Sequence, residues 1–130
     1  MQNNELSGKP ATVLIVDDEE MLVELLKRMI IRHGYNAISA VRAQEALDIY
    51  EQKKDDIDLV ITDLVMPEMG GRALAEELLR RNPNIKILIS TGFSAIDEIQ
   101  ALISQGVKGV VMKPYESDQL NISIKEALKN

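Results

Sequence analysis

The chain alternates two kinds of hydrophobic pattern from residue 12 onward. Continuous apolar runs rich in β-branched residues are typical of strands that are buried on both faces. Such runs are "TVLIV" at 12–16, "LVIT" at 59–62, "IKILIS" at 85–90 and "GVVM" at 109–112, and "NAISA" at 36–40 is a weaker example. After each run, apolar residues recur at spacings of three and four, which predicts an amphipathic helix.

The first of these helices carries more apolar residues than one face can bury. We assign its buried stripe to Leu22, Leu25, Leu26 and Met29, which leaves Val23 and Ile31 off the stripe. These two side chains are therefore predicted to be exposed apolar residues.

Capping residues and apolar stripes predict the positions of the other helices. Ser94 with Asp97 is typical of a capping box, Gly106 ends that helix, and Ser117 opens the last one. The lone His33 is expected to end the first helix rather than to bind a metal. The second and third helices are predicted from the stripes Ala43, Ala46, Leu47, Tyr50 and Leu74, Ala75, Leu78, Leu79.

Five alternations of strand and helix predict an α/β fold with a parallel sheet and right-handed crossovers. The expected architecture is a doubly wound, flavodoxin-like (βα)5 sheet with strand order 2-1-3-4-5 and helices on both faces. A chain of 130 residues fits one domain with its own core. Residues 1–11 are polar, with Gly8 and Pro10, and are predicted to form a flexible arm or linker before a domain at 12–130.

Composition narrows the function. The chain has no Cys, which excludes disulfides, thiolate metal sites and thiol nucleophiles. Its net charge of −6 disfavours direct binding to nucleic acid and favours attraction of metal cations. No apolar run approaches the roughly 20 residues of a membrane span, and the first residues lack the apolar segment of a signal peptide. We therefore expect a cytoplasmic protein.

Polar residues follow the predicted strands at their carboxyl ends: Asp17 and Asp18, then Asp63, Thr91 and Lys113. Each one alone could cap a helix, bond its own turn or lie at a solvated terminus. If the first and third strands are neighbours, however, the three carboxylates converge with Lys113 on one edge of the sheet.

Clustered carboxylates repel one another and raise one another's pKa unless a cation or a shared proton compensates. Mg²⁺ is the natural partner, because it prefers carboxylate, carbonyl, water and phosphate oxygens. The chain offers no cluster of His or Cys for a softer metal. A magnesium site at this edge is therefore predicted.

Four short segments in order resemble the response-regulator receiver domain of two-component phosphorelays, over about Thr12 to Lys129: "VDDEE", "DLVMPEMGG", "STGFS" and "MKPY". The resemblance implies that Asp63 is phosphorylated and that Thr91 and Lys113 contact the phosphoryl group. It also implies that Asp18, Asp63 and the carbonyl of Val65 bind Mg²⁺, with Asp17 supporting the ion through water. The Lys113–Pro114 peptide bond is a candidate for the cis form.

The resemblance further implies a partner, a histidine kinase or a histidine phosphotransfer domain, which could be separate or part of a larger hybrid sensor kinase. The chain would be a bacterial phosphoacceptor that assists its own phosphorylation and dephosphorylation rather than an enzyme with a separate substrate, and a monomer or weak dimer.

Receivers usually carry Tyr or Phe three residues before the lysine. Val110 stands there in this chain, so switching by rotation of an aromatic ring is doubtful. Apolar Val65 and Phe93 are expected to shield the phosphoryl group from water.

Three other classes of protein are alternatives to this interpretation. A flavodoxin-like cofactor binder needs hydrogen-bond donors after its first strand, where "DDEE" would repel phosphate. A haloacid-dehalogenase-like phosphatase would carry a second acid two residues after its nucleophilic aspartate, where this chain has Val65. A receiver-like domain used only for docking would share the fold, and formation of an acyl phosphate would distinguish it.

Overall fold

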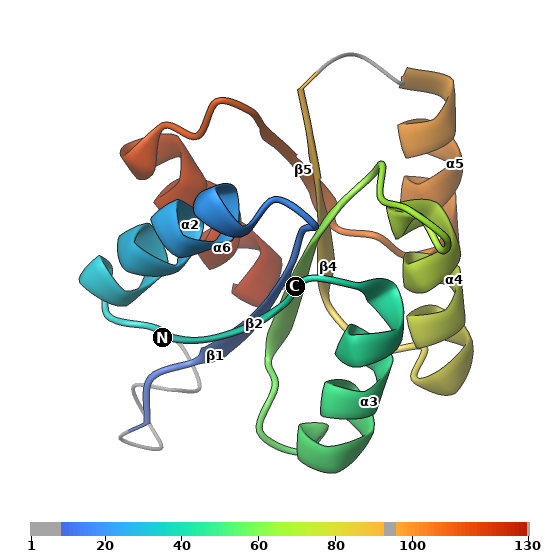
Figure 1. Ribbon diagram of the computed structural model, residues 1–130, viewed down its shortest axis with the longest axis horizontal. Helices are drawn as coiled ribbons and strands as arrows, with labels where there is room; N and C mark the ends of the chain where they lie inside the picture. Colours follow the sequence, from blue (N-terminus) through green and yellow to red (C-terminus); the bar gives the residue numbers. More distant parts are fainter. Residues whose placement is uncertain (1–8, 93–95, 130) are drawn as a thin grey trace.

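The computed structural model describes residues 9–92 and 96–129. A five-stranded sheet, with all neighbouring strands parallel, has the order β2-β1-β3-β4-β5 and is covered on both faces by helices (Figure 1). The predicted fold class and strand order are therefore confirmed. The strands are β1 (Thr12–Val16), β2 (Asn36–Ala40), β3 (Leu59–Asp63), β4 (Ile87–Thr91) and β5 (Gly109–Met112). The helices are α2 (Glu20–Arg32), α3 (Ala43–Lys53), α4 (Gly71–Arg81), α5 (Ile96–Gln105) and α6 (Ser117–Lys129).

The sheet separates two hydrophobic clusters. Alternate residues of each strand face opposite sides, so Leu14 and Val60 enter one cluster while Val13 and Leu59 enter the other. Helices α3, α4 and α5 cover the first cluster, and α2 and α6 cover the second (Figure 1). Every residue of β3 and β4 is buried, which explains their continuous apolar runs.

Helix α2 presents a different face to the core from the one predicted. Its buried residues are Val23, Leu26 and Ile30, and Val23 is only 3% exposed. Leu25, a member of the predicted buried stripe, is 44% exposed. The prediction that Val23 is exposed is wrong, whereas Ile31 is exposed as expected, at 53%.

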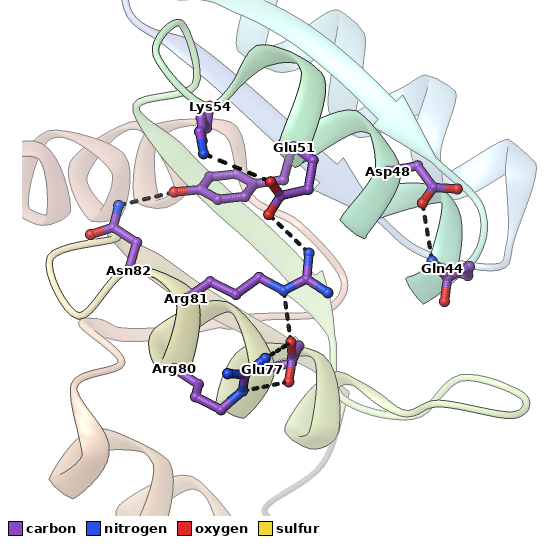
Figure 2. Close-up of polar contacts among 9 residues, drawn as sticks. Gln44, Asp48, Glu51, Lys54, Glu77, Arg80, Arg81 and Asn82 are labelled. Carbon is purple, nitrogen blue, oxygen red and sulfur yellow. Dashed lines mark hydrogen bonds and ion pairs between the residues drawn. The ribbon is translucent and has the colours of Figure 1, made fainter.

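A network of charged side chains joins α3 to α4 at the surface (Figure 2). Arg81 donates to Glu77 at 2.7 Å and to Glu51 on α3 at 3.0 Å. Hydrogen bonds from Arg80 and then Arg81 lower the pKa of Glu77 to about 2. Because most of these groups are exposed, the network adds little to the stability of the fold.

Most of the predicted helix boundaries agree with the structure. Helix α6 begins at Ser117, Gly106 follows α5 with a positive φ of 125°, and His33 is the C-cap of α2. The capping role predicted for Ser94 and the shielding role predicted for Phe93 concern side chains that lie outside the described residues. The arm predicted at residues 1–11 lies mostly outside them too.

Candidate functional site

The carboxyl ends of β1 and β3 bring three aspartates together. Asp17 and Asp18 follow β1, and Asp63 is the last residue of β3, which pairs with β1 so that Thr62 lies beside Val16. One carboxylate oxygen from each aspartate lies within 4.8 Å of those of the other two. Asp17 and Asp63 are buried, at 2% and 8% exposed, while Asp18 is exposed. The predicted convergence of these carboxylates is confirmed.

Lys113 reaches this cluster from the end of β5. Its Nζ donates to Asp17 Oδ2 and to Asp63 Oδ1, both at 3.0 Å. Burial alone would lower the pKa of Lys113, but the hydrogen bonds to the two carboxylates outweigh burial and raise it above its usual value. Lys113 therefore remains a cation throughout the physiological pH range.

Asp63 lies in an unfavourable position for a negative charge. Burial is the largest influence on the pKa of Asp63 and raises it, and the charges of Asp17 and Asp18 act in the same direction. The hydrogen bond from Lys113 lowers this pKa but does not cancel those effects. The three carboxylates and one ammonium leave a formal charge of −2, which one divalent cation would neutralise.

The chemistry of these donors fits Mg²⁺. Three carboxylates within reach of one ion, on a partly open surface, suit a hard cation that keeps several of its waters. A groove of about 450 Å³ opens beside Asp18 and is also lined by Arg42, Pro67 and Glu68. Asp18, the exposed member of the cluster, is thus accessible from the solvent.

The loop after Asp63 is folded back tightly onto the strand. Gly71 N donates to Leu64 O at 2.9 Å, and a Cβ at Gly71 would lie only 1.9 Å from the carbonyl oxygen of Asp63. Glu68 has a positive φ of 67°, which this reversal requires. Leu64 is buried in the core, whereas Val65 is 76% exposed. Glycine at position 71 therefore allows α4 to begin directly beneath Asp63.

Thr91 ends β4 and is 7% exposed, and its carbonyl accepts a 2.9 Å hydrogen bond from Lys113 N. The Lys113–Pro114 bond is cis, as predicted. Val110 lies in β5 and lines a cavity of about 180 Å³ between β5 and α6 that has no aromatic residue in its wall.

One polar contact beside the site was not predicted from the sequence. The hydroxyl of Tyr115 and the hydroxyl of Ser90 are 2.7 Å apart. Burial raises the pKa of Tyr115 above its usual value, so the phenol stays protonated. The sequence did contain a signal, because a serine inside a buried strand needs a hydrogen-bond partner.

The fold and the cluster define a doubly wound domain with an acidic site at the carboxyl edge of its sheet. The family model described as the response regulator receiver domain matches residues 13–125. The chain belongs to this family, whose members accept a phosphoryl group and interact with histidine kinases in two-component signalling. Receiver domains of this family bind Mg²⁺ at a cluster of aspartates.

Two similar proteins support this assignment to the receiver family. The chain is similar to the transcriptional regulatory protein GlrR of Escherichia coli (strain K12), with 36% identity over 95% of the chain and 28% of GlrR. It is also similar to the sensor kinase CckA of Brucella abortus (strain 2308), with 35% identity over 96% of the chain and 13% of CckA. The chain therefore spans less than a third of the length of each of these relatives.

Solved structures show the same fold. A response regulator receiver domain protein from Clostridium thermocellum aligns with a TM-score of 0.87 and 28% identity, over 92% of this chain and 94% of that one. CheY in a CheX-CheY-BeF3-Mg complex from Borrelia burgdorferi aligns with a TM-score of 0.89 and 25% identity, over 93% of this chain and 91% of that one.

Among the described residues, no helix is long and apolar enough to cross a bilayer.

Proposed function

We propose that Asp63 accepts a phosphoryl group from a phosphohistidine of a histidine kinase or a histidine phosphotransfer domain. The observation that carries this proposal is the position of Asp63, buried at the end of β3 and bonded to Lys113 beside two further carboxylates. A carboxylate in such a cluster is costly to the fold, which is typical of a functional group.

In the proposed step, a carboxylate oxygen of Asp63 bonds to phosphorus as the phosphorus–nitrogen bond of the donor breaks. The bonding electron pair stays on the imidazole nitrogen, and an acyl phosphate forms on Asp63 without water entering the balance. Lys113 and Thr91 would contact oxygens of the transferred group. The ammonium of Lys113 lies 3.0 Å from Asp63 Oδ1, so its positive charge is beside the carboxylate that would carry the transferred group.

Asp18, Asp63 and the carbonyl of Val65 would hold Mg²⁺, with Asp17 supporting the ion through a bound water. When bound, the ion supplies positive charge that offsets the charge of the phosphoryl oxygens and of the cluster. Asp17 is paired with Lys113 and accepts a 2.9 Å hydrogen bond from Glu19 N, which orients its carboxylate. Self-assisted phosphorylation and dephosphorylation follow from the same residues.

Helix α2 would receive the histidine-bearing partner. Met21 is 88% exposed on its first turn, three residues after Asp18, and Leu25 is exposed one turn later. Apolar side chains exposed on the helix that follows Asp17 and Asp18 suit a partner that must place its histidine over Asp63. With a net charge of −6, the chain is not expected to bind nucleic acid itself. A cytoplasmic monomer or weak dimer would serve this role.

Labelling with a small phosphodonor tests this function. The protein is incubated with acetyl phosphate and Mg²⁺, and the intact mass and the modified peptide are measured. One phosphoryl group on Asp63 is expected, with none on Asp63→Asn and normal labelling of Asp55→Asn, which changes an exposed turn aspartate. A wild-type protein that takes no label would identify a domain used only for docking.

A further inference from the structure

We propose that the hydrogen bond between Tyr115 and Ser90 is a latch that positions Lys113 for phosphoryl transfer. This inference rests on the proposed function of Asp63. In this role Tyr115 and Ser90 are positioning residues, because they act through Lys113 and do not touch the transferred group.

The latch joins two segments that both end at the site. Ser90 lies in β4 immediately before Thr91, is 1% exposed, and is paired in register with Asp63 on one side and Val111 on the other. Its carbonyl accepts a 3.0 Å hydrogen bond from Leu64 N, the residue that follows Asp63. Ser90 is thus fixed to the acceptor strand through its main chain.

Tyr115 is the other half of the latch and lies two residues after Lys113. The segment carrying Lys113 is attached to β4 at two points: Lys113 N to Thr91 O at 2.9 Å, and the Tyr115 hydroxyl to the Ser90 hydroxyl at 2.7 Å. With both ends held, the Lys113 backbone cannot drift from the strand that carries Thr91. Only its side chain is left to move.

Packing alone does not account for this pair. The Tyr115 ring packs against the core cluster under α2 and α6, and a phenylalanine would pack there equally well. Replacing both partners of a buried hydrogen bond with apolar groups of similar shape is often nearly neutral for stability. What the two hydroxyls add is a directional contact, and it lies between the elements that carry Lys113 and Asp63.

The latch matters because Lys113 must change partners during the reaction. In the unmodified protein its ammonium is shared between Asp17 and Asp63 at 3.0 Å each. After transfer, one of those contacts has to be replaced by a phosphoryl oxygen further out. A flexible side chain makes this change accurately only from a fixed backbone position.

Tyr115→Phe and Ser90→Ala test the latch, and Tyr50→Phe is the matched control. Tyr50 is 3% exposed, accepts a 2.9 Å hydrogen bond from Asn82 between α3 and α4, and lies away from the site. Tyr50→Phe removes a comparable hydrogen bond and therefore shows any effect on labelling that arises from a loss of stability alone. Melting temperature and Mg²⁺ affinity are measured for all variants.

The first readout does not involve phosphorylation. Hydrogen exchange of the Lys113 ammonium, followed by NMR in the unmodified protein, is expected to be faster in Tyr115→Phe and unchanged in Tyr50→Phe. The second readout is the rate of Asp63 labelling at saturating acetyl phosphate and Mg²⁺. It should fall about three- to tenfold in Tyr115→Phe, the range that one neutral hydrogen bond supports, with Mg²⁺ affinity unchanged.

Both single variants and the double variant should be slowed equally, because they remove the same contact. Additive losses, or an equal loss in Tyr50→Phe, would overturn the latch. So would a wild-type labelling rate in Tyr115→Phe. If the wild-type protein takes no label at all, the proposed function fails, and the ammonium exchange alone then decides whether Tyr115 positions Lys113.

Discussion

Replacing Asp18 by Asn should stabilise the metal-free protein. Asp17 and Asp63 share the ammonium of Lys113, whereas Asp18 is the exposed member of the cluster and has no ion pair among the described contacts. It nevertheless contributes to the raised pKa of Asp63. The substitution changes the formal charge of the site from −2 to −1 and keeps the shape of the side chain.

The size of the effect follows from the geometry. Carboxylate oxygens within 4.8 Å of one another repel by about 0.9 kcal/mol per pair at the dielectric constant of water. Asp18 is exposed, so this lower limit is appropriate, and attraction to Lys113 offsets part of the repulsion from its two neighbours. We expect a net gain of about 1 kcal/mol in the free energy of unfolding, or roughly 4 °C in melting temperature.

The assay is thermal unfolding followed by circular dichroism, in chelator and in Mg²⁺. Mg²⁺ at about ten times its dissociation constant should stabilise the wild-type protein by roughly 1.4 kcal/mol and the variant by much less. Asp55→Asn controls for loss of one negative charge elsewhere. The reasoning is refuted if Asp18→Asn melts below the wild type without metal, or if Mg²⁺ raises both melting temperatures equally.

Three other predictions concern the loop after Asp63, the pKa of Asp63 and the exposed side chain of Met21. Gly71→Ala should destabilise the fold by more than about 2 kcal/mol, because its Cβ would lie 1.9 Å from the Asp63 carbonyl oxygen, whereas Gly109→Ala meets only an ordinary 3.5 Å contact; equal denaturant midpoints would contradict this. Since burial and neighbouring carboxylates raise the pKa of Asp63, ionised Asp63 costs the metal-free fold stability at neutral pH, and this cost is relieved as the pH falls through the raised value. Asp63→Asn should therefore exceed the wild type in stability at about pH 7 and lose that advantage towards about pH 4, so a difference independent of pH would count against a raised pKa. Met21→Asp should slow phosphotransfer from the histidine-bearing partner and leave labelling by acetyl phosphate intact, whereas equal loss with both donors would indicate misfolding.

The sheet and the acidic cluster were predictable for one physical reason. Strands buried on both faces are continuous apolar runs, so their ends are sharply marked by the first charged residue. Asp17 and Asp63 follow directly from that rule once β1 and β3 are neighbours, and Lys113 follows from the end of β5. Parallel pairing then places all these ends on one edge, whatever the details of the loops.

The face of α2 was not predictable in the same way. Apolar residues occupy so many consecutive positions there that two stripes fit equally well, and they differ by about one residue. The structure buries Val23 and exposes Leu25, while Leu26 and Ile30 of the same helix pack in the cluster that also holds residues of β1 and α6, so the rotation of the helix is set by packing in the folded protein. A charged substitution at Val23, which the sequence alone predicts to be exposed, would therefore place a charge in the core.

The contact between Tyr115 and Ser90 was unpredictable for a different reason. The two residues are 25 positions apart, and their hydroxyls meet only because β4 and β5 are paired in one particular register. Sequence periodicity shows which side of a strand a residue faces, but it does not show which hydroxyl a neighbouring loop will bring to it.

The repulsion within the acidic cluster couples the stability of the fold to the binding of a cation. The fold tolerates two buried carboxylates because Lys113 bonds both, and it still carries an unbalanced charge at Asp63. Anything that binds the cluster only in the folded state must lower the free energy of that state, and the fold must in turn determine how tightly the cluster binds it. A substitution that relieves the repulsion therefore gains stability and loses cation affinity by related amounts. For this reason, the stability of Asp18→Asn and its response to Mg²⁺ must be measured together, since either one alone could arise from an unrelated change in the loop.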